Sequence, residues 1–213
     1  MQLRVTETFL SLQGESSFVG LPTYFIRLTG CPLRCNYCDT AYAFQGGSLV
    51  PIENLLEQSN ASGAKYVCVT GGEPLAQSEC LMLLTALCDA GFLVSLETSG
   101  ALPIDLVDKR VIKIVDIKTP DSGEVEKNHW QNINHLLPHD QVKFVIGSQQ
   151  DYQWSKKIVQ EHRLQNKVSD VLFSPSEGRI QPADLARWIL EDKLRVRFQL
   201  QLHKIIWGNK RGV

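Results

Sequence analysis

Short runs of β-branched and aromatic residues recur along the chain and determine its predicted architecture. Six of them have the length and composition of buried strands, over residues 23–28, 65–70, 92–98, 113–118, 141–146 and 170–175. Segments with the apolar spacing of helices lie between several of these runs, over residues 50–59, 77–90, 151–161 and 182–190. This alternation predicts an α/β fold in which parallel strands are joined by helical crossovers.

The number of these units limits the shape of the predicted sheet. About six strand–helix units are too few for a closed barrel of eight strands, so the pattern predicts a partial (incomplete) β/α barrel or an open sheet. Residues 120–138 show weak periodicity, and we predict a loop or a poorly formed helix there. We expect residues 1–213 to form one domain, with its functional loops at the carboxyl ends of the strands.

Composition and charge disfavour several classes of function. The chain has 22 basic and 23 acidic residues, and a net charge of -1 provides no field that would attract nucleic acid or an anionic membrane. The first residues lack the pattern of a secretory signal, and no apolar run approaches the roughly 20 residues of a spanning helix. We therefore expect a cytoplasmic protein with no nucleic-acid or membrane partner, whose six cysteines stay reduced.

Three of the cysteines form one tight cluster directly after the first predicted strand. Cys31, Cys35 and Cys38 have the spacing C-x3-C-x2-C, which lets three thiolates converge on a small metal cluster and leaves a fourth position open. Structural zinc is an alternative, although it usually needs four protein ligands and only Asp39 and distant histidines are at hand. Burial as small core residues is a second alternative, which the polar residues around the cysteines disfavour.

A glycine-rich segment ends the second predicted strand. In the sequence TGGEP, Gly71 and Gly72 permit the close approach of a ligand to the backbone, and the carboxylate of Glu73 is able to pair with a cationic amine. The same letters also suit a tight turn before a helix, so this segment by itself leaves both interpretations open. The remaining cysteines, Cys68, Cys80 and Cys88, share no ligand spacing, and we interpret them as packing residues.

The cysteine spacing, with Tyr37 directly before the third cysteine, resembles the signature of the radical S-adenosylmethionine (SAM) superfamily. The resemblance implies a modified radical SAM core in which the three cysteines hold a 4Fe-4S cluster and the open iron binds SAM. An electron from the cluster then cleaves SAM to methionine and a 5′-deoxyadenosyl radical. The resemblance assigns to SAM the residues Tyr37, Cys38, Asp39, Gly71, Gly72, Glu73, Gly100, Ser148, Gln149, Gln150, Ser174 and Pro175.

Segments outside these two motifs resemble the 7-carboxy-7-deazaguanine synthase family, namely SLQGES, FIRLTGC, CDT, ETSG and DIKTP. Members of that family convert 6-carboxy-5,6,7,8-tetrahydropterin into 7-carboxy-7-deazaguanine with loss of ammonia, on the route to queuosine. Hydrogen abstraction by the deoxyadenosyl radical starts the reaction, so the resemblance implies no catalytic residue beyond the cofactor. It assigns to the substrate the residues Leu12, Gln13, Gly14, Glu15, Arg27, Thr98 and the terminal carboxylate of Val213.

Within that resemblance, particular side chains have particular roles. Glu15 would accept hydrogen bonds from the amino-pyrimidine edge of the pterin, and Arg27 would pair with the substrate carboxylate. The Thr40 hydroxyl would bind Mg2+ together with substrate oxygens and water. The resemblance is also our basis for expecting a homodimer and an electron donor such as flavodoxin or ferredoxin.

Two other functions remain as alternatives. A glycyl-radical activase would share the cysteine spacing and the GGEP segment but would act on a protein, and the SLQGE and ETSG segments argue against it. A non-enzymatic module would use the cysteines to hold zinc or a structural iron–sulfur cluster. Metal analysis separates this last case from an enzyme.

Overall fold

The computed structural model describes residues 1–208 and 210–213, in which one mixed sheet contains nine strands in the order β3-β1-β2-β4-β5-β6-β7-β8-β9. The strands are β1 (Gln2–Leu12), β2 (Pro22–Leu28), β3 (Ser48–Pro51), β4 (Tyr66–Gly71), β5 (Leu93–Thr98), β6 (Ile112–Asp116), β7 (Gln141–Ile146), β8 (Asp170–Pro175) and β9 (Arg197–Phe198). From β2 to β9 every neighbouring pair is parallel, whereas β1 runs antiparallel to both β2 and β3. The sheet is not closed, which confirms the prediction of an incomplete barrel.

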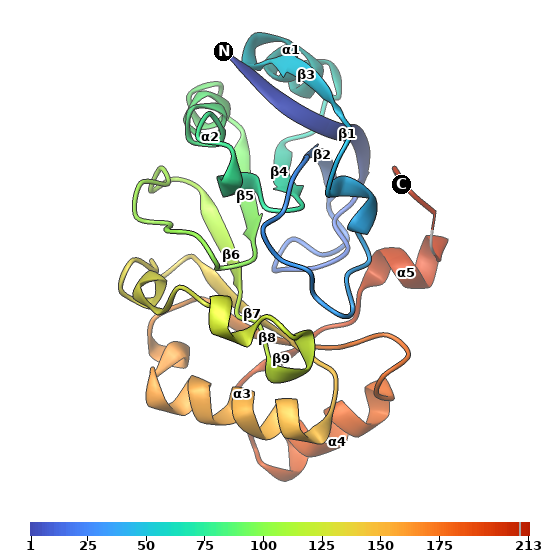
Figure 1. The fold of residues 1–213 in the computed structure, drawn as a ribbon, viewed down its shortest axis with the longest axis vertical. Coiled ribbons are helices and arrows are strands. Elements are labelled where there is room, and N and C mark those ends of the chain that lie inside the picture. Colours follow the sequence, from blue (N-terminus) through green and yellow to red (C-terminus); the bar gives the residue numbers. More distant parts are fainter. Residues whose placement is uncertain (209) are drawn as a thin grey trace.

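Four helices cover the outer face of the sheet, and a fifth lies near the carboxyl terminus (Figure 1). They are α1 (Ile52–Ala61), α2 (Cys80–Asp89), α3 (Gln149–Glu161), α4 (Pro182–Glu191) and α5 (Leu202–Trp207). In Figure 1, α1 and α2 lie beside the first half of the sheet, while α3 and α4 lie together near β7, β8 and β9. The six predicted strands and four predicted helices are all present, with boundaries within a few residues.

The apolar core consists of two clusters on this outer side. The first packs β1, β2, β4 and β5 against α1 and α2, with Leu3, Ile26, Val69 and Leu83 fully buried. The second cluster packs β7 and β8 against α3 and α4. It contains several aromatic residues, including the edge-to-face pair Phe144 of β7 and Phe173 of β8. Burial of these apolar faces stabilises the fold by about 25 cal/mol per Å² removed from water.

Several elements differ from the predicted pattern. The sequence pattern does not predict β1, because a bulge between Val5 and Glu7 interrupts its regular alternation of inward and outward residues. The two-residue β9, the four-residue β3 and the short α5 are likewise unpredicted. The crossover from β6 to β7 contains three short 3-10 turns instead of a helix, which agrees with the loop predicted for residues 120–138. Their bounds are Pro120–Ser122, Val125–Lys127 and Trp130–Asn134.

Candidate active site

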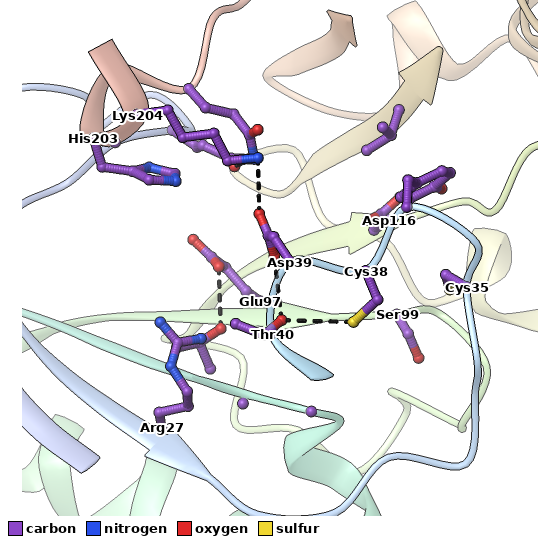
Figure 2. Close-up of a pocket in the computed structure, with 18 of the residues that line it drawn as sticks. Arg27, Cys35, Cys38, Asp39, Thr40, Glu97, Ser99, Asp116, His203 and Lys204 are labelled. Carbon is purple, nitrogen blue, oxygen red and sulfur yellow. Dashed lines mark hydrogen bonds and ion pairs between the residues drawn. The ribbon is translucent and has the colours of Figure 1, made fainter. Parts of the chain in front are cut away.

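A cavity of about 710 Å³ opens at the carboxyl ends of the parallel strands and is closed on one side by the chain's last residues. The inner wall of the cavity is formed by side chains of neighbouring strands. On each strand every second side chain faces the cavity, because successive side chains point to opposite faces of the sheet. The polar members of this wall are Arg27, Thr70, Glu97, Asp116 and Lys143. Figure 2 shows several of these side chains around the cavity, together with the loop that carries the cysteines.

The loop after β2 places all three clustered cysteines in the cavity wall. Gly30 has a φ of 100°, a value that L side chains rarely adopt, and its N–H donates to the carbonyl of Ala43 at 2.8 Å. This turn directs the chain from the strand into the cavity. Burial raises the pKa of the Cys31 thiol and raises that of the Cys35 thiol to about 11. Because iron binds thiolates, cluster assembly must release these protons.

The glycines of the GGEP segment lie directly against the cysteine loop. A Cβ on Gly72 would lie 2.3 Å from the carbonyl oxygen of Gly30 and 2.8 Å from the Cβ of Cys31. A Cβ on Gly71 would meet the carbonyl oxygen of Leu28 at 2.4 Å. Both positions therefore require glycine for close backbone packing, and both line the cavity.

The side chain of Glu73 is fully buried and satisfies protein donors instead of facing the cavity. It accepts hydrogen bonds from the Thr98 hydroxyl at 2.9 Å, from the Ser99 N–H at 2.6 Å and from the Leu75 N–H at 3.0 Å. The Ser99 hydroxyl also donates to it. Glu73 thus connects the ends of β4 and β5, and the carboxylate that the sequence assigns to SAM has its acceptor sites occupied by the protein.

Asp116 and Tyr37 supply polar atoms without a protein partner on the cysteine side of the cavity. One oxygen of Asp116 accepts from Lys118 Nζ at 2.8 Å, whereas its Oδ1 and the Tyr37 hydroxyl are buried with no hydrogen-bond partner among the described residues. Lys118 lies 5.9 Å from the centre of the Tyr37 ring. Although burial lowers the pKa of Lys118, Asp116 and Tyr37 raise it above the ordinary value. Buried polar atoms left unpaired in this way suit a polar ligand.

On the opposite side of the cavity, Glu15 and Arg27 each form an ion pair, and the Arg27 pair is partly buried. Lys143 of β7 donates to Glu15, and Gln201 Nε2 donates to the other carboxylate oxygen at 2.6 Å. Arg27 Nε donates to Glu7 at 2.8 Å, leaving its two terminal nitrogens unpaired with any described residue. Lys143 lies 128 residues from Glu15 along the chain, whereas Glu7 lies on the strand that directly precedes that of Arg27.

Residues 201–208 and 210–213 contribute the wall of the cavity beside the cysteine loop. His203 packs so closely on Gly14 that a Cβ there would lie 2.1 Å from the imidazole Nδ1. Lys204 of α5 pairs with Asp39 at 3.0 Å and with Glu177 at 3.2 Å, and Figure 2 shows Asp39 between Lys204 and Thr40. The Arg211 guanidinium lies 4.0 Å from the centre of the Tyr42 ring, a cation–π contact that holds the tail near Val213.

Most of the sequence-predicted site residues line this one cavity. They are Leu12, Gln13, Gly14, Glu15, Arg27, Cys31, Cys35, Tyr37, Cys38, Asp39, Thr40, Gly71, Gly72, Thr98 and Val213. The structure places the others outside its lining, namely Glu73, Gly100, Ser148, Gln149, Gln150, Ser174 and Pro175. Ser148 instead caps α3 by accepting from the Asp151 N–H at 3.2 Å, and Gln149 and Gln150 begin that helix. The hydroxyl of Ser174 is buried without a partner in the described part of the chain.

Several lining residues are missing from the sequence prediction. Lys118, Lys143, Asp116 and Glu97 could have been found, because each alternates with core residues on a predicted strand or directly follows one. His203 had no such signal, since its position depends on how the carboxyl-terminal segment folds back over Gly14. Of the other three cysteines, Cys68 and Cys80 are fully buried and Cys88 packs against the first core cluster.

The donor atoms suit a cluster better than a single ion. Among the described residues, no three His, Cys, Asp or Glu side chains are arranged to hold one metal ion. The Thr40 hydroxyl donates to Asp39 Oδ1 at 3.3 Å and lies 3.9 Å from Cys38 Sγ. Three thiols in one wall, two closely packed glycines and unpaired polar atoms fit an iron–sulfur cluster with a polar ligand beside it.

Comparisons with known proteins agree with this geometry. The radical SAM superfamily model matches residues 25–117, which include the cysteine loop and the glycine-rich segment. The 7-carboxy-7-deazaguanine synthase of Chlorobaculum tepidum is 46% identical in an alignment of 215 positions, and the alignment covers 99% of this chain and 97% of the relative. The chain belongs to the 7-carboxy-7-deazaguanine synthase family. A member from Koribacter versatilis is 42% identical over 96% of this chain and 97% of its own length.

A solved structure extends the family likeness to the fold. The crystal structure of QueE from Escherichia coli has a TM-score of 0.78 and 25% identity to this chain, and the match covers 95% of each chain. As a member of the radical SAM superfamily, the chain is expected to carry a 4Fe-4S cluster and to use SAM. In the described part of the chain, no helix combines the length and apolar character needed to cross a membrane.

Proposed function

We propose that this protein converts 6-carboxy-5,6,7,8-tetrahydropterin into 7-carboxy-7-deazaguanine, with loss of ammonia, as a radical SAM lyase. One observation carries the proposal. The three cysteines lie within eight residues of one another and the residues assigned to the pterin extend from Leu12 to Val213, yet all of them line the same cavity of about 710 Å³. A cavity of this size is in the range of small-molecule sites and has room for two polar ligands side by side. The names and full-length likeness of the relatives support the substrate.

The cysteine side of the cavity is the proposed cofactor site. Cys31, Cys35 and Cys38 would hold the 4Fe-4S cluster, and the backbone of Gly71 and Gly72 would border SAM. When bound, these groups supply a 5′-deoxyadenosyl radical that abstracts hydrogen from substrate carbon. Tyr37, Asp39 and the unpaired oxygen of Asp116 are further proposed contacts with SAM. Seven of the predicted SAM residues lie outside the cavity lining. We propose that these residues hold the cavity-lining segments in place and do not contact SAM directly.

The opposite side is the proposed pterin site. The backbone of residues 12–14, the carboxylate of Glu15 and Thr98 would contact the ring, and the terminal nitrogens of Arg27 would form a two-point contact with the substrate carboxylate. Its partner Glu7, which also accepts from the Tyr42 hydroxyl at 2.7 Å, fixes the guanidinium in place. We also propose that the carboxylate of Val213 contacts the substrate.

Further properties complete the proposal. Thr40 would bind Mg2+ with substrate oxygens and water as the remaining ligands, because magnesium prefers oxygen and keeps several waters. We also propose a cytoplasmic homodimer in which residues 1–213 form one domain, reduced by a flavodoxin or ferredoxin and acting in queuosine biosynthesis. The continuous sheet supports the single domain.

Anaerobic reconstitution tests the proposed function. The reduced protein, given SAM, Mg2+ and 6-carboxy-5,6,7,8-tetrahydropterin, should form 7-carboxy-7-deazaguanine. Cys35→Ala should abolish both cluster formation and product, whereas Cys88→Ala, which changes a packing cysteine, should retain both. Release of 5′-deoxyadenosine without any deazaguanine would reject this substrate. Zinc without iron or sulfide would reject the radical mechanism and favour the metal-module alternative.

A further inference from the structure

Lys143, the ion-pair partner of Glu15 on the pterin side of the cavity, has no role in the proposed contacts with cofactor or substrate. Lys143 lies in the middle of β7, and Glu15 lies in the turn after β1, 128 residues away along the chain. Their side chains are only 13% and 10% exposed, and Lys143 Nζ donates to Glu15 Oε2. The pair therefore lies in the cavity wall, away from bulk water.

The charged groups around this pair favour its ionised form. Glu15 faces Lys143, the amide of Gln201 and the imidazole of His203; burial raises the pKa of its carboxyl, but these groups together lower it below the ordinary value. Lys143 also faces Asp116 on β6 and Glu97 on β5. Burial lowers the pKa of Lys143, whereas Glu15 and these two carboxylates raise it above the ordinary value.

We propose that Lys143 is a positioning residue that holds Glu15 as an ionised, acceptor-only carboxylate and thereby makes the site select a pyrimidine edge with two adjacent N–H donors. This proposal rests on the proposed function, which places the pterin ring at Glu15. An ionised carboxylate has about four acceptor positions. Lys143 and Gln201 occupy one on each oxygen, which leaves one on each oxygen for the ring N–H and the 2-amino group of a pterin.

Loss of the lysine charge would change what Glu15 recognises. Without Lys143 the buried carboxyl would have a raised pKa, because burial disfavours the charged form. A protonated Glu15 carries one O–H donor, which would donate to a 2-oxo group that stands in place of the 2-amino group. The discriminating pair of substrates is therefore 6-carboxy-5,6,7,8-tetrahydropterin and its 2-oxo analogue, 6-carboxy-5,6,7,8-tetrahydrolumazine.

The experiment compares kcat/KM for these two compounds in the reconstituted wild type and in Lys143→Met. The wild type should prefer the 2-amino compound by roughly 10⁴-fold, as sites built to bond a buried N–H do. Lys143→Met should reduce this preference by about tenfold or more. Its KM for the pterin should also rise as the pH falls from about 8 to about 6, relative to wild type, because Glu15 becomes protonated there.

Two further variants separate positioning from general damage. Lys113→Met is the matched control, because Lys113 is also buried and paired, with Asp140 at 2.9 Å, but lies outside the cavity lining. It should leave the preference unchanged. Lys143→Arg retains the charge and should restore most of the preference. Lys143→Gln repeats the neutral substitution with a polar side chain if the methionine variant does not take up iron.

The outcomes distinguish this proposal from the proposed function. A wild type that forms no deazaguanine would overturn both. A wild type that forms product, together with neutral Lys143 variants that take up iron and keep the full 2-amino preference, would overturn the role of Lys143 alone. Loss of preference in the neutral variants, with the preference retained in Lys143→Arg and Lys113→Met, is the result we expect.

Discussion

Replacing Glu73 by alanine tests whether this buried carboxylate supports the site or contacts SAM directly. The substitution removes the acceptor for two backbone N–H groups, those of Ser99 and Leu75, and for the hydroxyls of Thr98 and Ser99. Each buried N–H left without a partner costs about 1–3 kcal/mol, whereas the hydroxyls can rotate toward other acceptors. Allowing for water that enters the space, we expect Glu73→Ala to lower the free energy of unfolding by about 3–5 kcal/mol.

Urea unfolding under anaerobic conditions, followed by far-ultraviolet circular dichroism, measures this loss. With a slope near 2 kcal/mol per molar urea, the midpoint should fall by about 2 M. Affinity for SAM should fall as well, because the segment that holds Gly72 loses its connection to β5. Glu57→Ala, which removes an exposed carboxylate on α1, is the matched control and should stay within about 0.5 kcal/mol of wild type. Lost SAM affinity with an unchanged midpoint would refute the supporting role and indicate direct contact.

Three other parts of the site give measurable outcomes. Gly72→Ala should displace the loop at Cys31 and lower iron content per chain, because its Cβ would lie 2.8 Å from the Cβ of that cysteine. Lys143 lowers the pKa of Glu15 in the folded protein, so the ion pair stabilises the fold at pH values above the ordinary glutamate pKa of about 4.3. This stabilisation is lost as the pH falls through the lower pKa of the folded state. In Lys143→Met the pKa of the buried Glu15 would instead be raised, so its ionisation destabilises the variant near pH 7 and its protonation removes that cost at lower pH. The stability gap between wild type and Lys143→Met in urea unfolding should therefore narrow from about pH 7 to about pH 4. Appending glycines after Val213 should raise KM for the pterin by about tenfold, with iron content unchanged.

Each of these outcomes has a control or a contradicting result. Gly147→Ala is the control for Gly72→Ala. A Cβ on Gly147 would meet only side chains, the nearest being Asp121 at 3.0 Å, so this variant should keep its iron. A stability gap that is constant with pH would show that Lys143 does not lower the pKa of Glu15. Full activity in the extended chain would remove Val213 from the site.

The strand pattern predicted most of the fold because parallel strands buried on one face leave a strong apolar signal. The runs at β2, β4, β7 and β8 are recognisable from composition alone. β1 was missed because its bulge between Val5 and Glu7 changes the face on which alternate residues lie. α5 has six residues and no buried residue, so neither length nor amphipathic pattern distinguishes it from a loop.

The cofactor side of the site was easier to predict than the network around the pterin side. Cys31, Cys35 and Cys38 are close in sequence, so their spacing alone indicates a shared ligand. The ion pair of Lys143 with Glu15 joins residues 128 positions apart and depends on tertiary structure. The GGEP motif indicates Glu73 as a site residue but does not predict the hydrogen bonds that its carboxylate accepts from Leu75, Thr98 and Ser99.

The most direct test of a shared cavity for cofactor and pterin follows hydrogen from one to the other. The reconstituted protein would be given pterin deuterated at its saturated ring carbons, and the adenosyl group would be recovered as SAM and as 5′-deoxyadenosine. Deuterium should appear in the 5′-methyl or methylene group of the recovered adenosyl compounds, together with formation of 7-carboxy-7-deazaguanine. Cleavage of SAM with no deuterium in those compounds would contradict a shared cavity.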